Sequence, residues 1–265
     1  MHLAFDGGAR YFDTAPFHGY GRAELRVGEL LRDLPRTSYV LSTKVGRTMR
    51  PIRSAPLDAS HRLGGLPFTA DYDYSYYGTM RSVEQSMIRT GISTFDMLLV
   101  HDLHCFIHMD SVELERHYAS AIGGAFRALA QLKRNGIVRA VGGGVNEAPL
   151  CARLIRDTDL DCVLLAGRYT LLDQTACDEV IPLCEARGIA LIAGGPFNSG
   201  ILAATPQAGV AYHYSAAPPE VIERAICLDA IEVEHGTTLH AAALQFPLNS
   251  PVVAAVIPGA RSVVE

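Results

Sequence analysis

The chain is poor in lysine and in any concentration of charge. Its 265 residues include two lysines, Lys44 and Lys133, and its net charge is −5, with neither a basic stretch nor an acidic tail. Nucleic-acid binding usually depends on a concentrated basic surface, so we expect no nucleic-acid partner. Lys44 stands at the end of an apolar segment, and in a chain with so few lysines we expect a residue in that position to have a specific role.

The sequence also lacks the marks of a membrane protein, a secreted protein and a metalloprotein. No apolar run is long enough to cross a bilayer, and residues 1–10 do not resemble a signal peptide. The six cysteines show no CxxC or CxH spacing, and most of them fall within apolar patterns. We therefore expect a cytoplasmic protein with free thiols, no metal and no membrane partner.

What the chain does have is enough apolar material for a sizeable core. Hydrophobic residues make up 49% of the sequence. α/β barrels of about 250 residues fold as one domain, so we expect residues 1–265 to form a single barrel domain. We expect this domain to exist as a monomer or a homodimer.

Apolar strand-like segments alternate with helical patterns. The expected strands are 9–15, 38–46, 95–102, 140–145, 161–167, 189–195 and 252–259. The expected helices are 22–34, 79–91, 120–136, 148–158, 177–188 and 218–236. Near-continuous apolar strands indicate a parallel sheet covered on both faces, and the intervening helices indicate right-handed crossovers.

This pattern predicts an α/β fold of the (β/α)8 barrel type that lacks its first strand and its last helix. The sequence opens on what looks like the end of a helix and stops just after the seventh strand. An open doubly wound sheet fits less well, because polar residues follow most of the strands rather than one switch point. The segment VGGGVN (141–146) is not a GxGxxG fingerprint, since no spaced third glycine opens the next helix.

Three polar residues end three of the apolar strands. RYFDT contains Asp13, YVLSTK ends on Lys44, and FDMLLVH ends on His101. A charge at the end of a buried strand is costly without a partner or a task. Each residue alone could be part of a buried ion pair or a satisfied core imidazole. Together they favour a catalytic cluster at the carboxyl-terminal mouth of a barrel.

The motifs around these residues resemble those of the aldo-keto reductases over nearly the whole chain. The similar segments are RYFDTAPFHGYGRAELRVGELL, LSTKVGR, LLVHD, VGGGVN, AGRYTLLDQ, IAGGPFNSGIL and VIPGARS. Among the family's branches, these motifs most resemble those of the D-threo-aldose (L-fucose) 1-dehydrogenases and pyridoxal 4-dehydrogenases. The resemblance implies an oxidoreductase that moves a hydride between NADP or NAD and a small aldose, lactol or aldehyde.

The resemblance also implies roles for the three strand-end residues. Hydride transfer requires an acid or base at the substrate oxygen. In the family a tyrosine serves there, its pKa lowered by the charge of a lysine that matches Lys44 and pairs with an aspartate that matches Asp13. A histidine that matches His101 orients the substrate oxygen.

The chain departs from the family pattern at the tyrosine. Five residues after Asp13 stands His18, and Tyr20 follows two residues later. His18 is one candidate for the proton-transferring group, because an imidazole titrates near neutrality. Tyr20 is another, because the glycines on either side of it would allow it to swing inward, or else to line the substrate pocket. The third alternative is an impaired site.

The cofactor residues are implied by the resemblance alone. Asn146 matches a residue that holds the nicotinamide carboxamide, with a turn or N-cap role as the alternative, and Tyr169 matches the pocket wall. The phosphate-wrapping loop would comprise Gly195, Pro196, Phe197, Asn198, Ser199 and Gly200. The adenosine end would meet Ile257, Pro258, Gly259 and Arg261, although Arg261 could equally be solvated. The family's usual glutamine and aromatic platform are replaced by Ala166 and Gly194.

A loop over about 47–78 is expected to cover the substrate. It contains the aromatic residues Phe68, Tyr72, Tyr74, Tyr76 and Tyr77. Apolar faces with polar tips suit a sugar or a substituted aromatic aldehyde, and the sequence does not choose between them. Two other functions stay open: a Schiff-base lyase that uses Lys44, and a nucleotide-binding protein with little turnover.

Overall fold

The computed structural model describes residues 1–52, 64–103, 110–207, 209–213 and 215–260. The chain divides into two compact units, Met1–Gly144 and Val145–Glu265, and each is described by itself. Among the described residues, no helix is long and apolar enough to cross a membrane. No disulfide joins the five cysteines in this part of the chain, and Cys105 lies outside it.

The first unit is built on four parallel strands. They are β1 (Tyr11–Asp13), β2 (Val40–Val45), β5 (Phe95–His101) and β6 (Val138–Val145). They are hydrogen-bonded in the order β1-β2-β5-β6, and the register pairs Asp13 with Ser42 and Lys44 with Leu99. Apart from Val40 and Met97, the apolar side chains of β2 and β5 are buried, which is why these segments are largely hydrophobic in the sequence.

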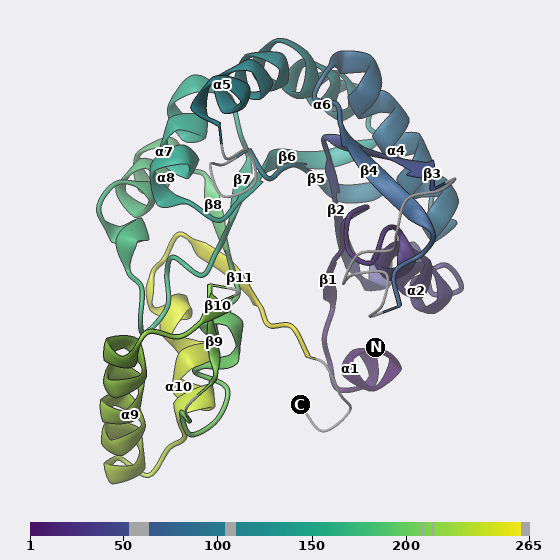
Figure 1. Cartoon of the computed structure of the whole chain (residues 1–265). Coiled ribbons are helices and arrows are strands. Elements are labelled where there is room, and N and C mark those ends of the chain that lie inside the picture. The colour runs from purple at the N-terminus through teal and green to yellow at the C-terminus, as the bar shows by residue number, and fades with distance from the viewer. Residues whose placement is uncertain (53–63, 104–109, 208, 214, 261–265) are drawn as a thin grey trace. The chain divides into compact units, whose positions relative to one another are not determined.

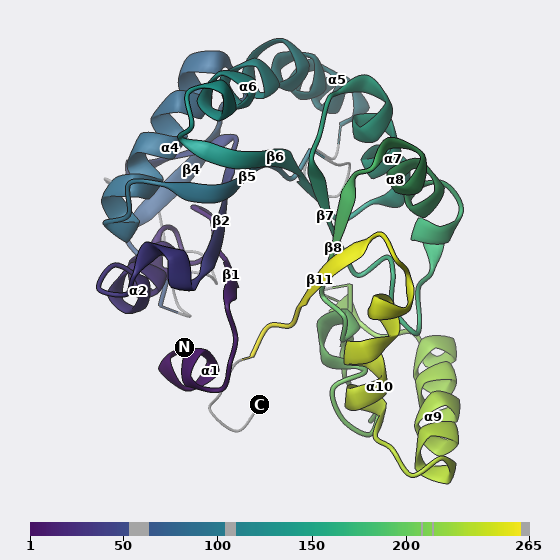
Figure 2. The same ribbon diagram turned by 180° about the vertical axis from the view of Figure 1, so that it is seen from behind.

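Helices cover one face of these strands (Figures 1 and 2). The helices of the first unit are α1 (His2–Asp6), α2 (Arg22–Leu31), α4 (Tyr76–Thr90), α5 (Ser111–Ser120) and α6 (Phe126–Arg134). α2 packs against α4, and α4 packs against α6. α4 ends at Gly91, whose positive φ of 68° completes the expected glycine cap.

The expected loop over 47–78 is partly regular. β3 (Arg47–Pro51) and β4 (Phe68–Tyr72) pair as an antiparallel hairpin, and residues 53–63 lie outside the described part. α4 begins at Tyr76 rather than at residue 79, because the hydroxyl of Ser75 caps the helix by accepting from the N–H of Gly78. The turn-forming residues of this stretch predict a loop, but the backbone of β3 is hydrogen-bonded to that of β4.

The helix expected over 120–136 is the second half of a longer helical run. α5 starts at Ser111, where Asp110 caps it, and continues through a π-helical turn at Ala121–Ala125 into α6. The sequence AIGGA, with two adjacent glycines, is a plausible place for such a wide turn. The expected helix begins one residue before this turn and therefore leaves out α5.

The second unit contains three parallel strands, paired in the order β7-β8-β11. They are β7 (Cys162–Ala166), β8 (Ala190–Gly194) and β11 (Val253–Ile257). The helices are α7 (Ala148–Asp157), α8 (Val180–Arg187), α9 (Pro219–Glu234) and α10 (Leu239–Gln245). A short hairpin of β9 (Ala211–Tyr212) and β10 (Ser215–Ala216) precedes α9 (Figure 1). The hairpin and α10 were not expected from the sequence.

All seven expected strands are present, four in the first unit and three in the second. A separate apolar cluster in the second unit joins the segment after β8 to α9 and α10. It includes Leu172, Ile201, Leu202, Ala225, Leu239 and Ala243. This cluster anchors the loop 195–200, which the resemblance assigns to cofactor binding.

Candidate active site

Three adjacent strands of the first unit carry the predicted polar residues at their carboxyl ends. Asp13 is the last residue of β1, Lys44 the last but one of β2, and His101 the last of β5. β2 lies between β1 and β5, and all three strands run parallel. The acid, the amine and the imidazole therefore share one end of the sheet.

Asp13 and Lys44 form a nearly buried ion pair. Nζ of Lys44 donates to Oδ2 of Asp13 at 2.5 Å and to the backbone oxygen of Thr14 at 2.9 Å. The hydroxyl of Ser42 donates to the other oxygen of Asp13 at 2.5 Å, and 4% of the lysine side chain is exposed. Buried charges are tolerated when they are paired and hydrogen-bonded. These partners hold the ammonium at a defined position.

Two imidazoles, those of His18 and His101, lie close enough to Lys44 to be affected by its charge. The ring centroids of His18 and His101 are 6.0 Å apart, with the rings at 83° to each other. Burial lowers the pKa of His101 well below its usual value, and the nearby carboxylate of Asp102 only partly offsets this effect. His101 is therefore neutral at pH 7.

His18 is reached by solvent, although protein atoms surround much of its ring. Loss of hydration, with a further contribution from the Lys44 ammonium, lowers the pKa of His18 from 6.5 to about 4. Since the ring keeps contact with water, the direction of this shift is what matters. Any pKa below 6.5 leaves the His18 imidazole mainly neutral at pH 7.

The turn that carries His18 has an unusual backbone. Gly19, Tyr20 and Gly21 all have positive φ, at 63°, 52° and 99°. The Tyr20 side chain is buried, with its ring edge-on to Phe17 at 5.4 Å between centroids. The structure thus places the ring of His18 beside His101 and the ring of Tyr20 beside Phe17.

A second buried ion pair next to His101 was missed in the sequence. Arg47, the first residue of β3, pairs with the carboxylate of Asp102, and 2% of the arginine side chain is exposed. The guanidinium carbon lies 3.8 Å from the ring centroid of Phe17 and 4.8 Å from that of Tyr72. Both residues stand in recognised motifs, but they are 55 positions apart, so no local pattern reveals the pairing.

The aromatic residues expected over the substrate have different environments. Tyr74 is buried and its hydroxyl donates to the backbone oxygen of His101 at 2.8 Å. The hydroxyl of Tyr76 donates to Gln131 Oε1 at 2.9 Å, and Tyr77 is 82% exposed. Phe68 begins β4 and Tyr72 ends it. Tyr72 and Tyr74 are the members of this set that lie near His101 and Arg47.

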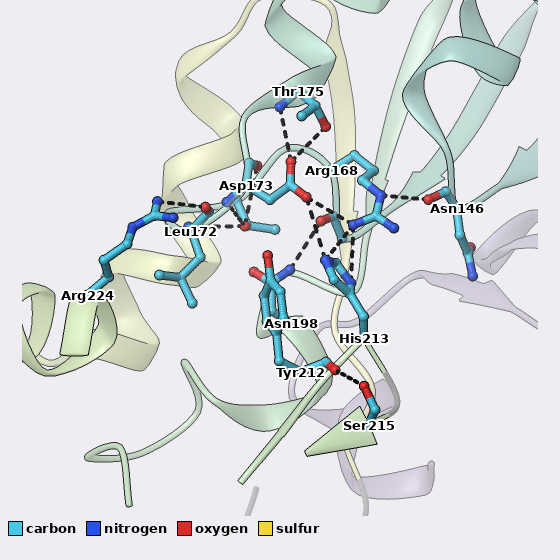
Figure 3. A network of polar contacts seen from close by, with 12 residues as sticks. Asn146, Arg168, Leu172, Asp173, Thr175, Asn198, Tyr212, His213, Ser215 and Arg224 are labelled. Atoms are coloured by element: carbon cyan, nitrogen blue, oxygen red, sulfur yellow. Dashed lines mark hydrogen bonds and ion pairs between the residues drawn. The ribbon is translucent and has the colours of Figure 1, made fainter. Parts of the chain in front are cut away.

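In the second unit, a polar network is centred on Arg168 (Figure 3). Nε of Arg168 donates to the backbone oxygen of Asn146 at 2.7 Å, and Nη1 donates to Asp173 Oδ2 at 2.9 Å. Nη1 also lies 2.5 Å from Nε2 of His213, at the tip of the β9–β10 hairpin. The network ties the ends of β6 and β7 to the hairpin, and the side-chain amide of Asn146 extends away from it.

The loop after β8 presents a strained and incompletely satisfied segment. Asn198, Ser199 and Gly200 have successive positive φ values of 44°, 64° and 108°. Nδ2 of Asn198 donates to the backbone oxygen of Gly167 at 3.1 Å. Oδ1 of this buried side chain has no hydrogen-bond partner in the described part of the chain. A buried acceptor of this kind is suited to a ligand that brings a donor.

The remaining predicted cofactor residues are spread over the second unit. Tyr169 is buried, with its ring 5.2 Å from that of Phe246. Gly195 has a φ of 58° and begins the turn that contains Pro196 and Phe197. Ile257 ends β11, and Pro258 and Gly259 follow it. Arg261 lies outside the described residues, so its predicted role at the adenosine end stays a prediction.

Taken together, the first unit offers a fixed cation and two neutral imidazoles. Such a set can accept a proton from a hydroxyl and stabilise the negative charge that develops on its oxygen. The second unit offers backbone-rich loops and an unsatisfied amide oxygen. Among the described residues, no group of three or more histidine, cysteine or acidic side chains is placed to hold a metal.

Comparison with known proteins agrees with this chemistry. A model of the aldo/keto reductase family matches residues 1–265. The chain is 43% identical to pyridoxal 4-dehydrogenase of Microbacterium luteolum, over 99% of this chain and 79% of that protein. It is 37% identical to D-threo-aldose 1-dehydrogenase of a Pseudomonas species, over 98% of this chain and 77% of that protein.

Solved structures give the same fold. An aldo-keto reductase from Bacillus halodurans in its holo form is similar with a TM-score of 0.72 at 22% identity, over 99% of this chain and 76% of that one. The glycerol dehydrogenase of Gluconobacter oxydans has a TM-score of 0.69 at 21% identity, over 96% and 73% of the two chains. The predicted (β/α)8 barrel of aldo-keto reductase type is therefore confirmed as the fold class.

Proposed function

Because the chain belongs to the aldo/keto reductase family of NAD(P)-dependent oxidoreductases, we propose that it is a dehydrogenase for a small aldose, lactol or pyridoxal-like aldehyde. The observation that carries the proposal is the buried pair of Lys44 and Asp13 beside two neutral imidazoles. The names of the two relatives support substrates of this size and class. They leave the choice between a sugar and a pyridoxal-like compound to experiment.

In the proposed reaction, His18 accepts the hydroxyl proton of the substrate as its carbon is oxidised. A neutral imidazole is an effective general base near pH 7, whereas a protonated one is not. The ammonium of Lys44 stabilises the alkoxide character that develops on the substrate oxygen, and Asp13 keeps that ammonium in place. His101, whose ring lies beside that of His18, orients the substrate. The bound nicotinamide supplies the two-electron step by accepting the hydride.

We propose that the second unit holds the NAD or NADP. A nicotinamide nucleotide brings amide and hydroxyl donors that would satisfy the buried Oδ1 of Asn198. The loop 195–200 suits its phosphates because its glycines, Gly195 and Gly200, allow a ligand to approach the backbone closely. Asn146 would contribute its side-chain amide, which Arg168 positions through the backbone.

The Schiff-base alternative is disfavoured by the environment of Lys44. A lysine that forms a Schiff base attacks as a neutral amine. Here Nζ is held by hydrogen bonds to a carboxylate and to a backbone oxygen, so it is not free to attack a carbonyl. A lyase would also need no nicotinamide.

The test is a fluorescence titration with NADH and NADPH, followed by a screen of aldoses and pyridoxal for reduction of NAD or NADP. We expect saturable binding of at least one nucleotide and turnover of at least one of these substrates. Borohydride is added with each substrate in parallel. Absence of nucleotide binding together with borohydride trapping at Lys44 would contradict the proposal.

A further inference from the structure

A chain of contacts links Arg47 to the ring of His101. One oxygen of Asp102 pairs with Arg47, and the other, Oδ1, lies 3.4 Å from Nε2 of His101. The backbone oxygen of His101 is held in turn by the hydroxyl of Tyr74. Arg47, Asp102, His101 and Tyr74 are all buried residues. Both the peptide and the ring of His101 are therefore constrained from the side of β3 and β4.

The Arg47–Asp102 pair is poorly explained by stability alone. Removing two charges from water is costly, and a well-packed apolar pair of similar volume is often as stable. Nε and Nη1 of Arg47 have no hydrogen-bond partner among the described residues, so the burial of Arg47 is incompletely compensated. Asp102 also has a φ of 57°, a left-handed conformation that few residues other than glycine, asparagine and aspartate adopt readily.

On the basis of the proposed function, we propose that Asp102, fixed by Arg47, is a positioning residue that sets the orientation and tautomer of His101. A carboxylate facing Nε2 favours the tautomer that carries its proton there, as in other histidines oriented by a carboxylate. Nδ1 then becomes the hydrogen-bond acceptor of the ring. Arg47 keeps Asp102 from turning away, and the rings of Phe17 and Tyr72 hold the guanidinium in place.

The central variant is Asp102→Asn, which removes the charge, keeps the shape and tolerates the positive φ. We expect kcat to fall about tenfold to a hundredfold, the usual effect of losing a group that orients a functional histidine. The Kd for the nicotinamide nucleotide should not change, because Asp102 does not hold it. Nitrogen chemical shifts of His101 should move away from the pure Nε2–H tautomer.

A matched control lies on the β3–β4 hairpin, which also carries Arg47. Asp71 on β4 pairs with Arg50 on β3, and both side chains are largely exposed. Asp71→Asn makes the same substitution in an exposed arginine–aspartate pair, and we expect it to leave kcat and the His101 shifts as they are in the wild type. If Asp71→Asn had the same effect as Asp102→Asn, a general effect on the hairpin would be responsible and the positioning role would be rejected.

The double variant Arg47→Met with Asp102→Asn separates positioning from stability. It removes both buried charges, so no uncompensated charge remains, and we expect a folded protein with kcat as low as in Asp102→Asn. Recovery of wild-type kcat in the double variant would overturn the proposal. The His101 shifts are measured without substrate, so they test the positioning role even if the dehydrogenase assignment fails. Unchanged His101 shifts in Asp102→Asn would also overturn it.

Discussion

At the scale of single residues, His18 is the group on which the proposed proton transfer depends. The turn after β1 places an imidazole beside His101, while the nearby phenol of Tyr20 packs on Phe17. A neutral imidazole next to an ammonium is a better base than acid. The proposed enzyme is therefore suited to oxidation of an alcohol or lactol more than to reduction of a carbonyl.

Substitutions at positions 18 and 20 distinguish the two possible proton-transferring groups. We expect His18→Phe to lower kcat about a hundredfold or more, the usual contribution of a general base. His18→Tyr should retain or raise activity, because it restores the family pattern. Tyr20→Phe keeps the ring on Phe17 and should have little effect. Steady-state kinetics provide the measurement, and a harmless His18→Phe beside a crippling Tyr20→Phe would assign the role to Tyr20.

The pH dependence of oxidation gives a second check on His18. The pKa of this imidazole is lowered from its usual value of 6.5, so the base is available at neutral pH and is lost only in acid. We expect kcat/KM for oxidation to be level around neutrality and to drop at a pH below 6.5. A tyrosine base would instead make oxidation accelerate as the pH rises above neutrality, because the phenol becomes a base only when it ionises. A profile of that second kind would contradict the role of His18.

At the scale of elements, the features that could be predicted from the sequence are those that depend on a local residue pattern. The seven strands and the grouping of Asp13, Lys44 and His101 follow from apolar runs that end in polar residues. The β3–β4 hairpin, the start of α5 and the pairing of Arg47 with Asp102 depend on contacts between distant segments. The turn-rich composition of residues 47–78 predicted a loop in place of the hairpin. The predicted helix began at residue 120, just before the π-helical turn, whereas α5 begins at Ser111.

One element contact should contribute strongly to stability. Glu24 of α2 is fully buried and accepts hydrogen bonds from Arg89 of α4 at 2.5 Å and Thr43 of β2 at 2.7 Å. Arg89→Met would leave this carboxylate without its cation, and we expect a loss of about 3–5 kcal/mol in the free energy of unfolding. Chemical denaturation measures this. Arg50→Met, in an exposed pair, should leave the transition unchanged, and equal losses in both variants would refute the burial argument.

The β9–β10 hairpin should loosen in mild acid. Burial and the charge of Arg168 lower the pKa of His213, so the folded state favours the neutral imidazole, which accepts from Arg168. The unfolded state binds the proton more readily, so this contribution is complete above pH 6.5 and is lost as the pH falls below it. We expect amide protection factors in the hairpin to fall between pH 7 and pH 5.

His213→Asn provides the control for the hairpin. Asparagine keeps an acceptor and tolerates the φ of 49° at this position, but it does not titrate. Protection in this variant should not change between pH 7 and pH 5. If the hairpin of the variant loosens in acid as much as that of the wild type, the titration of His213 is not the cause.

At the scale of the whole molecule, the two units carry complementary parts of one proposed chemistry. The first contains the ion pair and the imidazoles, and the second contains the loops proposed to bind the nucleotide. The family match extends across both, from residue 1 to residue 265. The central claim is therefore that this chain moves a hydride to a nicotinamide.

The most direct test follows the hydride itself. An aldose deuterated at C1, or pyridoxal deuterated at its aldehyde carbon, is incubated with the chain and NAD or NADP, and the nucleotide is analysed by mass spectrometry. We expect deuterium in the reduced nicotinamide for the wild type. Lys44→Met should give almost none while still binding the nucleotide. Deuterium transfer by Lys44→Met at the wild-type rate, or product formation without label in the nucleotide, would contradict the account.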